Sequence, residues 1–166
     1  MTARRAYLAT LVCFALVLVG SAFALPADVP LHFGGSGDPD RWGSRAEALT
    51  TMTAVGGLLA VILGGTAALV DRMPLTYLNV PHKEWWTATP ERETRMRSMM
   101  RTDLYALAAA TMLFLAVVVL ATTLAARSED PALGPFFFAG LACYLVVVLG
   151  WTGWALSTRY RRRDDA

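Results

Sequence analysis

The chain has 166 residues, of which 55% are hydrophobic and 17% are charged, and its formal net charge is +2. Its mean hydropathy of +0.44 is too high for an ordinary soluble domain of this length. The small net charge does not indicate a nucleic-acid partner, because the basic residues lie where a membrane protein needs them.

Four segments are long and apolar enough to cross a bilayer, whose hydrocarbon core of about 30 Å takes about 20 helical residues. They lie near residues 7–25, 48–70, 104–126 and 135–157. We therefore predict an all-α membrane protein, with residues 1–166 forming a single domain of four transmembrane helices. A loop at 26–47 joins the first two helices, and a loop at 71–103 joins the second and third.

The first span has a second interpretation. "MTARRAY" is a short basic segment, "LATLVCFALVLVG" is apolar, and "SAFA" resembles a signal-peptidase site. The segment therefore fits either a transmembrane helix or a cleaved secretory signal, and the other three spans do not depend on this choice.

The basic residues predict the orientation, because cytoplasmic loops of membrane proteins are rich in lysine and arginine. Of the 15 such residues, all but Arg41, Arg45 and Arg127 lie near the N-terminus, in the loop at 71–103 or in the C-terminal tail. We therefore expect a multi-pass membrane protein with both termini in the cytoplasm and the loop at 26–47 outside.

The outer loop, within "LPADVPLHFGGSGDPDRWGSR", is rich in residues that form turns. Asp40 or Ser44 is suited to cap the second helix. His32, Asp38 and Asp40 form the only close cluster of possible ligands outside the membrane. Three ligands on a glycine-rich loop make a poor cage for a metal ion, so we predict no metal site and no cofactor.

The second span carries small residues at every fourth position, which lie on one side of a helix. These residues are Gly56, Ala60, Gly64 and Ala68. Because small residues let two helix backbones approach closely in a membrane, this ridge predicts packing against a neighbouring helix. The alternative is that the ridge forms a contact between two copies of the chain.

The loop at 71–103 is predicted to end in a helix. Thr89 is suited to the N-cap and Pro90 to the first helical position, so a helix of about 35 residues should begin there and run into the third span. Met96, Met99, Met100 and Leu104 follow a helical stripe, which fits packing inside the chain or binding of a partner helix.

No span has an ionisable residue in its interior. This argues against a pump, a proton-coupled transporter or an intramembrane metalloprotease. His82, Lys83 and Glu84 have no nucleophile beside them, so we predict no catalytic residues and no enzyme.

Two motifs carry a family resemblance. The first has the form Pro-x-x-x-Pro-x-His, followed by a glycine, an aspartate and an aromatic residue, and the second is an Asn-x-Pro followed by a tryptophan. Their residues here are Pro26, Pro30, His32, Gly37, Asp40 and Trp42, then Asn79, Pro81 and Trp86. The chain thereby resembles a family of small bacterial membrane proteins whose best known relatives are immunity proteins of the SdpI type. These protect cells from a secreted toxin, and they have extra spans that this chain lacks.

The resemblance implies a non-enzymatic, multi-pass protein of the bacterial plasma (inner) membrane that recognises a peptide or protein partner, as an immunity protein or a sensor does. The candidate partner-binding residues are Pro26, Pro30, His32, Gly37, Asp38, Asp40, Trp42, Asn79, Pro81 and Trp86. The first alternative is an accessory subunit of a larger membrane complex or transporter, and the second is an enzyme with a metal ion at His32. The expected partners are the lipid bilayer and a membrane protein or peptide, with no nucleic acid.

Overall fold

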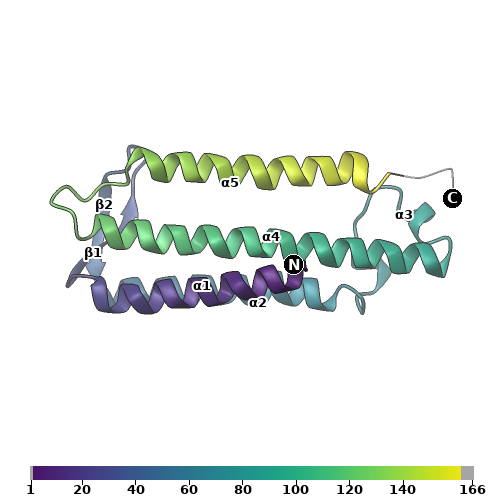
Figure 1. The fold of residues 1–166 in the computed structure, drawn as a ribbon, viewed down its shortest axis with the longest axis horizontal. Coiled ribbons are helices and arrows are strands. Elements are labelled where there is room, and N and C mark those ends of the chain that lie inside the picture. The colour runs from purple at the N-terminus through teal and green to yellow at the C-terminus, as the bar shows by residue number, and fades with distance from the viewer. Residues whose placement is uncertain (1, 162–166) are drawn as a thin grey trace.

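Four long helices dominate the computed structural model, which describes residues 2–161 (Figure 1). They are α1 (Ala3–Ala24), α2 (Arg45–Leu69), α4 (Pro90–Ala125) and α5 (Pro135–Trp154), which a π-helical turn at Ala155–Arg159 extends. Each is long and apolar enough to cross a membrane, so the four predicted segments are helical and indicate a multi-pass membrane protein. Arg162 and Arg163 of the basic tail lie outside the described residues.

Side-chain caps begin three of these helices. Thr2, Ser44 and Thr89 each accept a hydrogen bond from the backbone N–H three residues further on. Such a cap satisfies one of the N–H groups that the first turn of a helix leaves without a partner. Pro90 occupies the start of α4, and the predicted helix of about 35 residues is confirmed by the observed 36.

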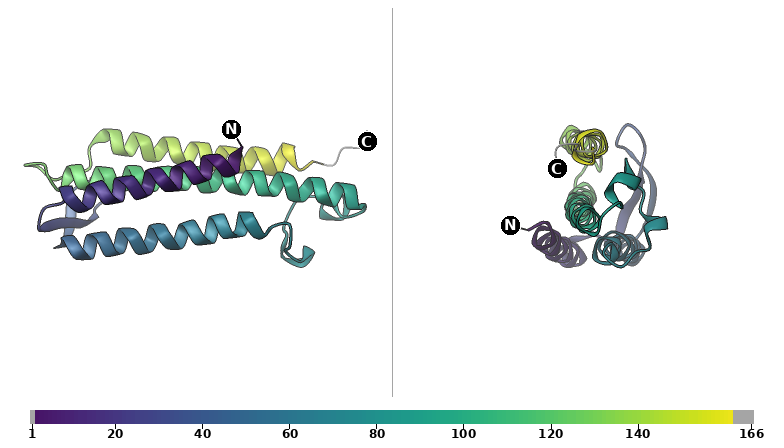
Figure 2. Two further views of the ribbon diagram at one scale, coloured as in Figure 1. Left: turned by 60° about the horizontal axis from the view of Figure 1, so that its bottom comes forward. Right: turned by 90° about the vertical axis from the view of Figure 1, so that its right-hand side faces the viewer.

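Helix α4 lies at the centre of the bundle (Figures 1 and 2). Helices α1 and α2 pack against one side of it and against each other, whereas α5 packs against α4 alone among the long helices. The main core cluster includes Tyr7 and Phe14 of α1 and Tyr105, Met112 and Val119 of α4. Residues Pro135–Trp154 of α5 contain no buried residue, so this helix is the most loosely held of the four.

The contact of α5 with α4 is centred on Tyr144. Its ring stacks on Phe114 with 4.5 Å between the ring centroids, and its hydroxyl lies 3.0 Å from the Thr111 hydroxyl. An aromatic stack combined with a hydrogen bond holds two helices together where lipid provides no hydrophobic driving force.

The small residues of α2 receive aromatic side chains from α1. A Cβ at Gly56 would lie 2.2 Å from the Phe14 ring, and one at Gly64 would lie 2.3 Å from the Tyr7 hydroxyl. That hydroxyl donates a hydrogen bond of 2.7 Å to the Ala60 carbonyl. Ala68 is exposed and lies beyond this contact. The first three residues of the predicted ridge therefore pack inside the chain.

The segment expected to be a loop between the first two spans forms an antiparallel hairpin of β1 (Asp28–Phe33) and β2 (Pro39–Ser44). The register pairs Asp28 with Ser44 and Phe33 with Pro39, with irregular pairing around His32. The fold is thus mostly helical rather than all-α. The prolines and glycines suggested only turns, because the contacts that hold the hairpin come from the helices beneath it.

At the opposite end, the connection between α2 and α4 folds back onto the bundle. It contains a short 3₁₀ turn (Leu75–Tyr77) and the single turn of α3 (Lys83–Trp86). The second core cluster of buried residues lies here and comprises Val70, Leu78, Val80, Trp86, Met96, Ala155 and Tyr160. Met96 is fully buried, and Met99, Met100 and Leu104 pack against the cluster, so the methionine stripe packs inside the chain.

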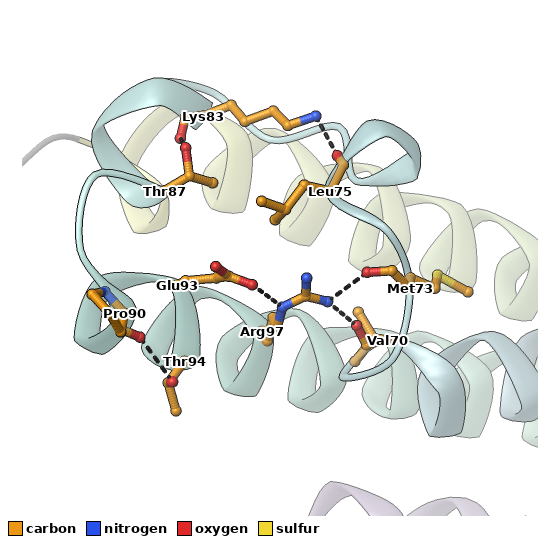
Figure 3. A network of polar contacts seen from close by, with 9 residues as sticks. All are labelled: Val70, Met73, Leu75, Lys83, Thr87, Pro90, Glu93, Thr94 and Arg97. Atoms are coloured by element: carbon orange, nitrogen blue, oxygen red, sulfur yellow. Dashed lines mark hydrogen bonds and ion pairs between the residues drawn. The ribbon is translucent and has the colours of Figure 1, made fainter.

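Arg97 ties this connection to α4 (Figure 3). Its guanidinium donates hydrogen bonds of 2.6 Å to the Val70 carbonyl and 2.9 Å to the Met73 carbonyl, and it forms an ion pair with Glu93. The last carbonyls of a helix have no hydrogen-bond partner within the helix and carry a partial negative charge. The Arg97 guanidinium at the end of α2 therefore supplies the missing hydrogen bond and offsets that charge.

Candidate binding site beneath the hairpin

The hairpin is anchored to the ends of α1 and α2. Val29 of β1 is fully buried against Leu25 and Ala48, which follow α1 and begin α2. Arg45 adds polar contacts, because its backbone N–H donates to the Ala27 carbonyl at 3.0 Å and its Nε donates to the Pro26 carbonyl at 3.2 Å. The hairpin is therefore fixed over one end of the bundle, called here the hairpin end.

The turn of the hairpin docks on the segment that leads into α5. Gly37 has a φ of 96°, a conformation that residues with a side chain rarely adopt. Its carbonyl accepts a 2.9 Å hydrogen bond from the Leu133 N–H. A Cβ at this position would lie 2.6 Å from the Leu133 carbonyl oxygen. Glycine is thus required both by the turn and by the close approach of the two backbones.

Gly37→Ala is expected to lower the free energy of unfolding by about 1–3 kcal/mol, because it strains the turn and pushes it away from Leu133. Thermal or denaturant unfolding in mild detergent measures this loss. Gly35→Ala is the matched control, since nothing lies within 4 Å of a Cβ there. Equal stability of the two variants would contradict the docking role of Gly37.

A cavity of about 420 Å³ lies beneath the hairpin, bounded by α2, α4 and the start of α5. Its depth is apolar, with Phe14, Met52, Val55, Leu115 and Val118 among the lining residues. This volume lies within the range of about 300–1,000 Å³ that is typical of small-ligand sites.

Polar and charged side chains lie at the edge of this cavity. His32 and Arg41 of the hairpin and Glu47 of α2 line it. His32 Nδ1 lies 2.6 Å from the Asp40 carboxylate, and Arg41 forms an ion pair with Glu47. Exposed pairs of this kind contribute little stability, so these groups can exchange their partners for those of a ligand at small cost.

The edge of the cavity combines a histidine with an arginine and a glutamate. The His32 ring faces Asp40. Among the described residues, no serine or threonine hydroxyl and no cysteine thiol forms a hydrogen bond with that ring. Within residues 2–161, His, Cys, Asp and Glu side chains also form no group of three that is suited to hold a metal ion. The arrangement offers an apolar volume and both signs of charge, which suits the noncovalent binding of an amphipathic ligand.

The structure separates the predicted site residues into two groups. Those from the first motif lie at the hairpin end, where Pro30 and His32 line the cavity, Gly37 and Asp38 belong to the turn, and Trp42 is 48% exposed. Asn79, Pro81 and Trp86 lie at the opposite end of the bundle. No single site therefore contains both motifs.

Trp86 has a structural position. It is 3% exposed, and its indole Nε1 donates a hydrogen bond of 3.2 Å to the Tyr160 carbonyl. Its side chain thus belongs to the second core cluster, while Asn79 is exposed and lines a small cavity of about 170 Å³ nearby.

The sequence reasoning missed Arg41 and Glu47 as residues of the cavity. A signal was present, because Ser44 and Glu47 have the spacing of a capping box. The Ser44 hydroxyl accepts from the Glu47 N–H as that motif predicts, but the Glu47 carboxylate turns to Arg41 of the hairpin instead. That choice depends on the hairpin, which the sequence did not reveal.

A buried polar cluster at the other end was also missed. Asp103 is 6% exposed, and its Oδ2 accepts hydrogen bonds from Arg159 Nε at 3.0 Å and from the Tyr160 hydroxyl at 2.8 Å. Burial and the contact with Asp103 raise the pKa of Tyr160, so its phenol stays protonated and donates. Asp103 directly precedes the apolar run of the third span, and its position alone did not distinguish it from an interfacial charge.

Part of the chain has recognisable relatives. Residues 8–57 match the model of a domain of unknown function, DUF1648, and cover most of α1, the hairpin and the first half of α2. An uncharacterized protein of Archaeoglobus fulgidus is 42% identical over 60 residues, which are 34% of this chain and 32% of that protein. The match thus spans about a third of the length of the relative. No solved structure matches the chain.

Proposed function

We propose that this protein binds an amphipathic peptide, or an amphipathic segment of a protein, at the hairpin end without catalysing a reaction on it. The observation that carries the proposal is the cavity of about 420 Å³, which combines an apolar depth with His32, Arg41 and Glu47 at its edge. An apolar side chain of the partner fills the depth, and its charged groups pair with the edge.

The resemblance to immunity proteins of the SdpI type supports a peptide as the partner, because those proteins act against a secreted toxin. The stretch that matches DUF1648 includes the hairpin and the cavity-lining residues of α1 and the first half of α2. In this proposal the hairpin and the cavity are the recognition unit, and α4 and α5 close its other sides.

We further propose that the protein lies in the plasma (inner) membrane of a bacterium with the hairpin outside and both termini in the cytoplasm. The distribution of basic residues supports this orientation, because among the lysines and arginines of residues 2–161 only Arg41, Arg45 and Arg127 lie on the hairpin side. A peptide secreted by a neighbouring cell would then reach the cavity directly.

Filling the cavity tests the proposal. Val118→Trp is expected to abolish partner binding, because Val118 lines the cavity and a tryptophan side chain would occupy it. Val117→Trp is the matched control, since the adjacent Val117 is 41% exposed and does not line the cavity. The measurement is partner recovery from native membranes by a photo-crosslinker placed at Thr51, another lining residue.

A second arm tests the charged edge. His32→Ala and Asp40→Ala should reduce partner recovery while leaving membrane insertion intact, because the two side chains pair outside the core. Unchanged recovery in Val118→Trp would refute binding in the cavity. If a stable multi-subunit complex were recovered in the same amount from all three variants, the accessory-subunit alternative would be favoured.

A further inference from the structure

A second cleft lies at the far end of the bundle from the hairpin, between the start of α1, the end of α2 and α4. Its volume is about 600 Å³, and its lining includes Thr2, Arg4, Asp71, Arg101, Thr102 and Tyr105. We call it the arginine cleft. It shares no lining residue with the cavity beneath the hairpin.

The arginine cleft carries a net positive charge. Arg101 forms an ion pair with Asp71, and among residues 2–161 no carboxylate lies within ion-pair distance of Arg4. Asp71 therefore neutralises only one of the two guanidinium groups. Arg5 and Arg72, next to the lining residues in sequence, are exposed and add to the positive potential of this region.

The position of the cleft along the helices matches the depth of lipid headgroups. Arg101 lies three residues before Leu104, where the apolar run of α4 begins, and Arg4 lies in the first turn of α1. Leu8 lies one helical turn after Arg4 on α1, Leu69 follows the lining residue Ala68 on α2, and the two leucines are 47% and 50% exposed. A ligand held between the arginines thus has apolar helix surface directly beneath it.

We propose that the arginine cleft binds the phosphate group of an anionic phospholipid, whose acyl chains lie along the exposed faces of α1 and α2. Guanidinium groups form paired, charge-assisted hydrogen bonds with phosphate oxygens. Basic pockets between transmembrane helices are suited to such headgroups. The neighbouring apolar surface favours a lipid over a free anion, because only a lipid fills both regions.

Titration of the full-length protein with defined lipids in mild detergent, read by native mass spectrometry, tests this site. Phosphatidylglycerol should bind more tightly than phosphatidylcholine, whose choline neutralises the phosphate. Arg4→Gln and Arg101→Gln should each weaken phosphatidylglycerol binding about fivefold. Asp71→Asn should strengthen it, because the competing carboxylate is removed.

Arg95→Gln is the matched control, because it removes the same charge from an exposed position of α4 outside the cleft. Its phosphatidylglycerol affinity should stay at the level of the unmodified chain. Arg4 forms no ion pair among residues 2–161, so its replacement tests binding without breaking an ion pair of the fold. Equal binding of the two lipids, or an equal loss in Arg95→Gln, would overturn the proposal. Competition by inorganic phosphate at millimolar concentration would also overturn it, in favour of a simple anion site.

Discussion

Gly64→Leu is expected to destabilise the bundle strongly, because the position is occupied by the side chain of Tyr7. A Cβ at Gly64 would lie 2.3 Å from the Tyr7 hydroxyl and 2.6 Å from its Cζ. The ring would have to leave its place in the main core cluster, and its hydrogen bond to the Ala60 carbonyl would be lost. Overpacking costs about 1–3 kcal/mol, and the lost hydrogen bond costs about 1 kcal/mol more.

The free energy of unfolding in mild detergent measures this effect. Gly65→Leu, one residue further on, is the matched control, because nothing lies within 4 Å of a Cβ at that position. The double variant Gly64→Leu with Tyr7→Ala tests whether the clash with Tyr7 is the cause. If it is, the double variant should lose less free energy of unfolding than the sum of the two single variants, because the ring that clashes with the introduced leucine is gone. If Gly64→Leu and Gly65→Leu were equally stable, α1 and α2 would not pack as described.

Asp103→Leu is expected to release the end of α5 from the bundle. Asp103 accepts hydrogen bonds from both Arg159 and Tyr160, and these are polar contacts that attach the turn after α5 to α4. Removing one partner of a buried ion pair costs about 3–5 kcal/mol. The loss should fall near the lower end of that range, because the Arg159 side chain is 26% exposed and keeps part of its hydration.

Hydrogen exchange of the backbone amides at 155–160, together with the free energy of unfolding, follows this release. Asp130→Leu serves as the control, because Asp130 is exposed and lies between α4 and α5 at the hairpin end. Replacing Asp103 and Arg159 together by leucine should recover most of the stability, since the second change removes the uncompensated charge. Unaltered exchange at 155–160 in Asp103→Leu would show that Asp103 does not hold α5.

These contacts bear on the proposed binding site because α5 is held at few points. One is the docking of Gly37 on the segment before it, another is the pair of Phe114 and Tyr144, and the third is the Asp103 cluster. Phe137 of α5 lines the cavity beneath the hairpin. The position of α5 therefore sets how open that cavity is. The residues that hold α5 in place thereby also determine the shape of the cavity.

The sequence alone determined the features that depend on local physics. A run of apolar residues long enough to cross a bilayer forms a helix there, because the hydrocarbon provides no other partner for backbone N–H and carbonyl groups. The start of α4 was equally predictable, since the Thr89 cap and Pro90 act on the adjacent turn. The methionine stripe and the small-residue ridge of α2 also indicated which faces could pack.

Only the tertiary structure decided which residues meet. The prolines and glycines at 26–44 allow many turns, and a hairpin forms because Val29 is buried between segments that lie 23 residues apart, Leu25 and Ala48. The cavity arises where that hairpin, α2, α4 and α5 converge, and it includes Arg41 and Glu47, whose pairing across the hairpin no local pattern predicted. Tyr160 likewise meets both Trp86 and Asp103 across more than 50 residues of chain. Such contacts depend on how the helices pack, and a local pattern of apolar and polar residues leaves that packing undetermined.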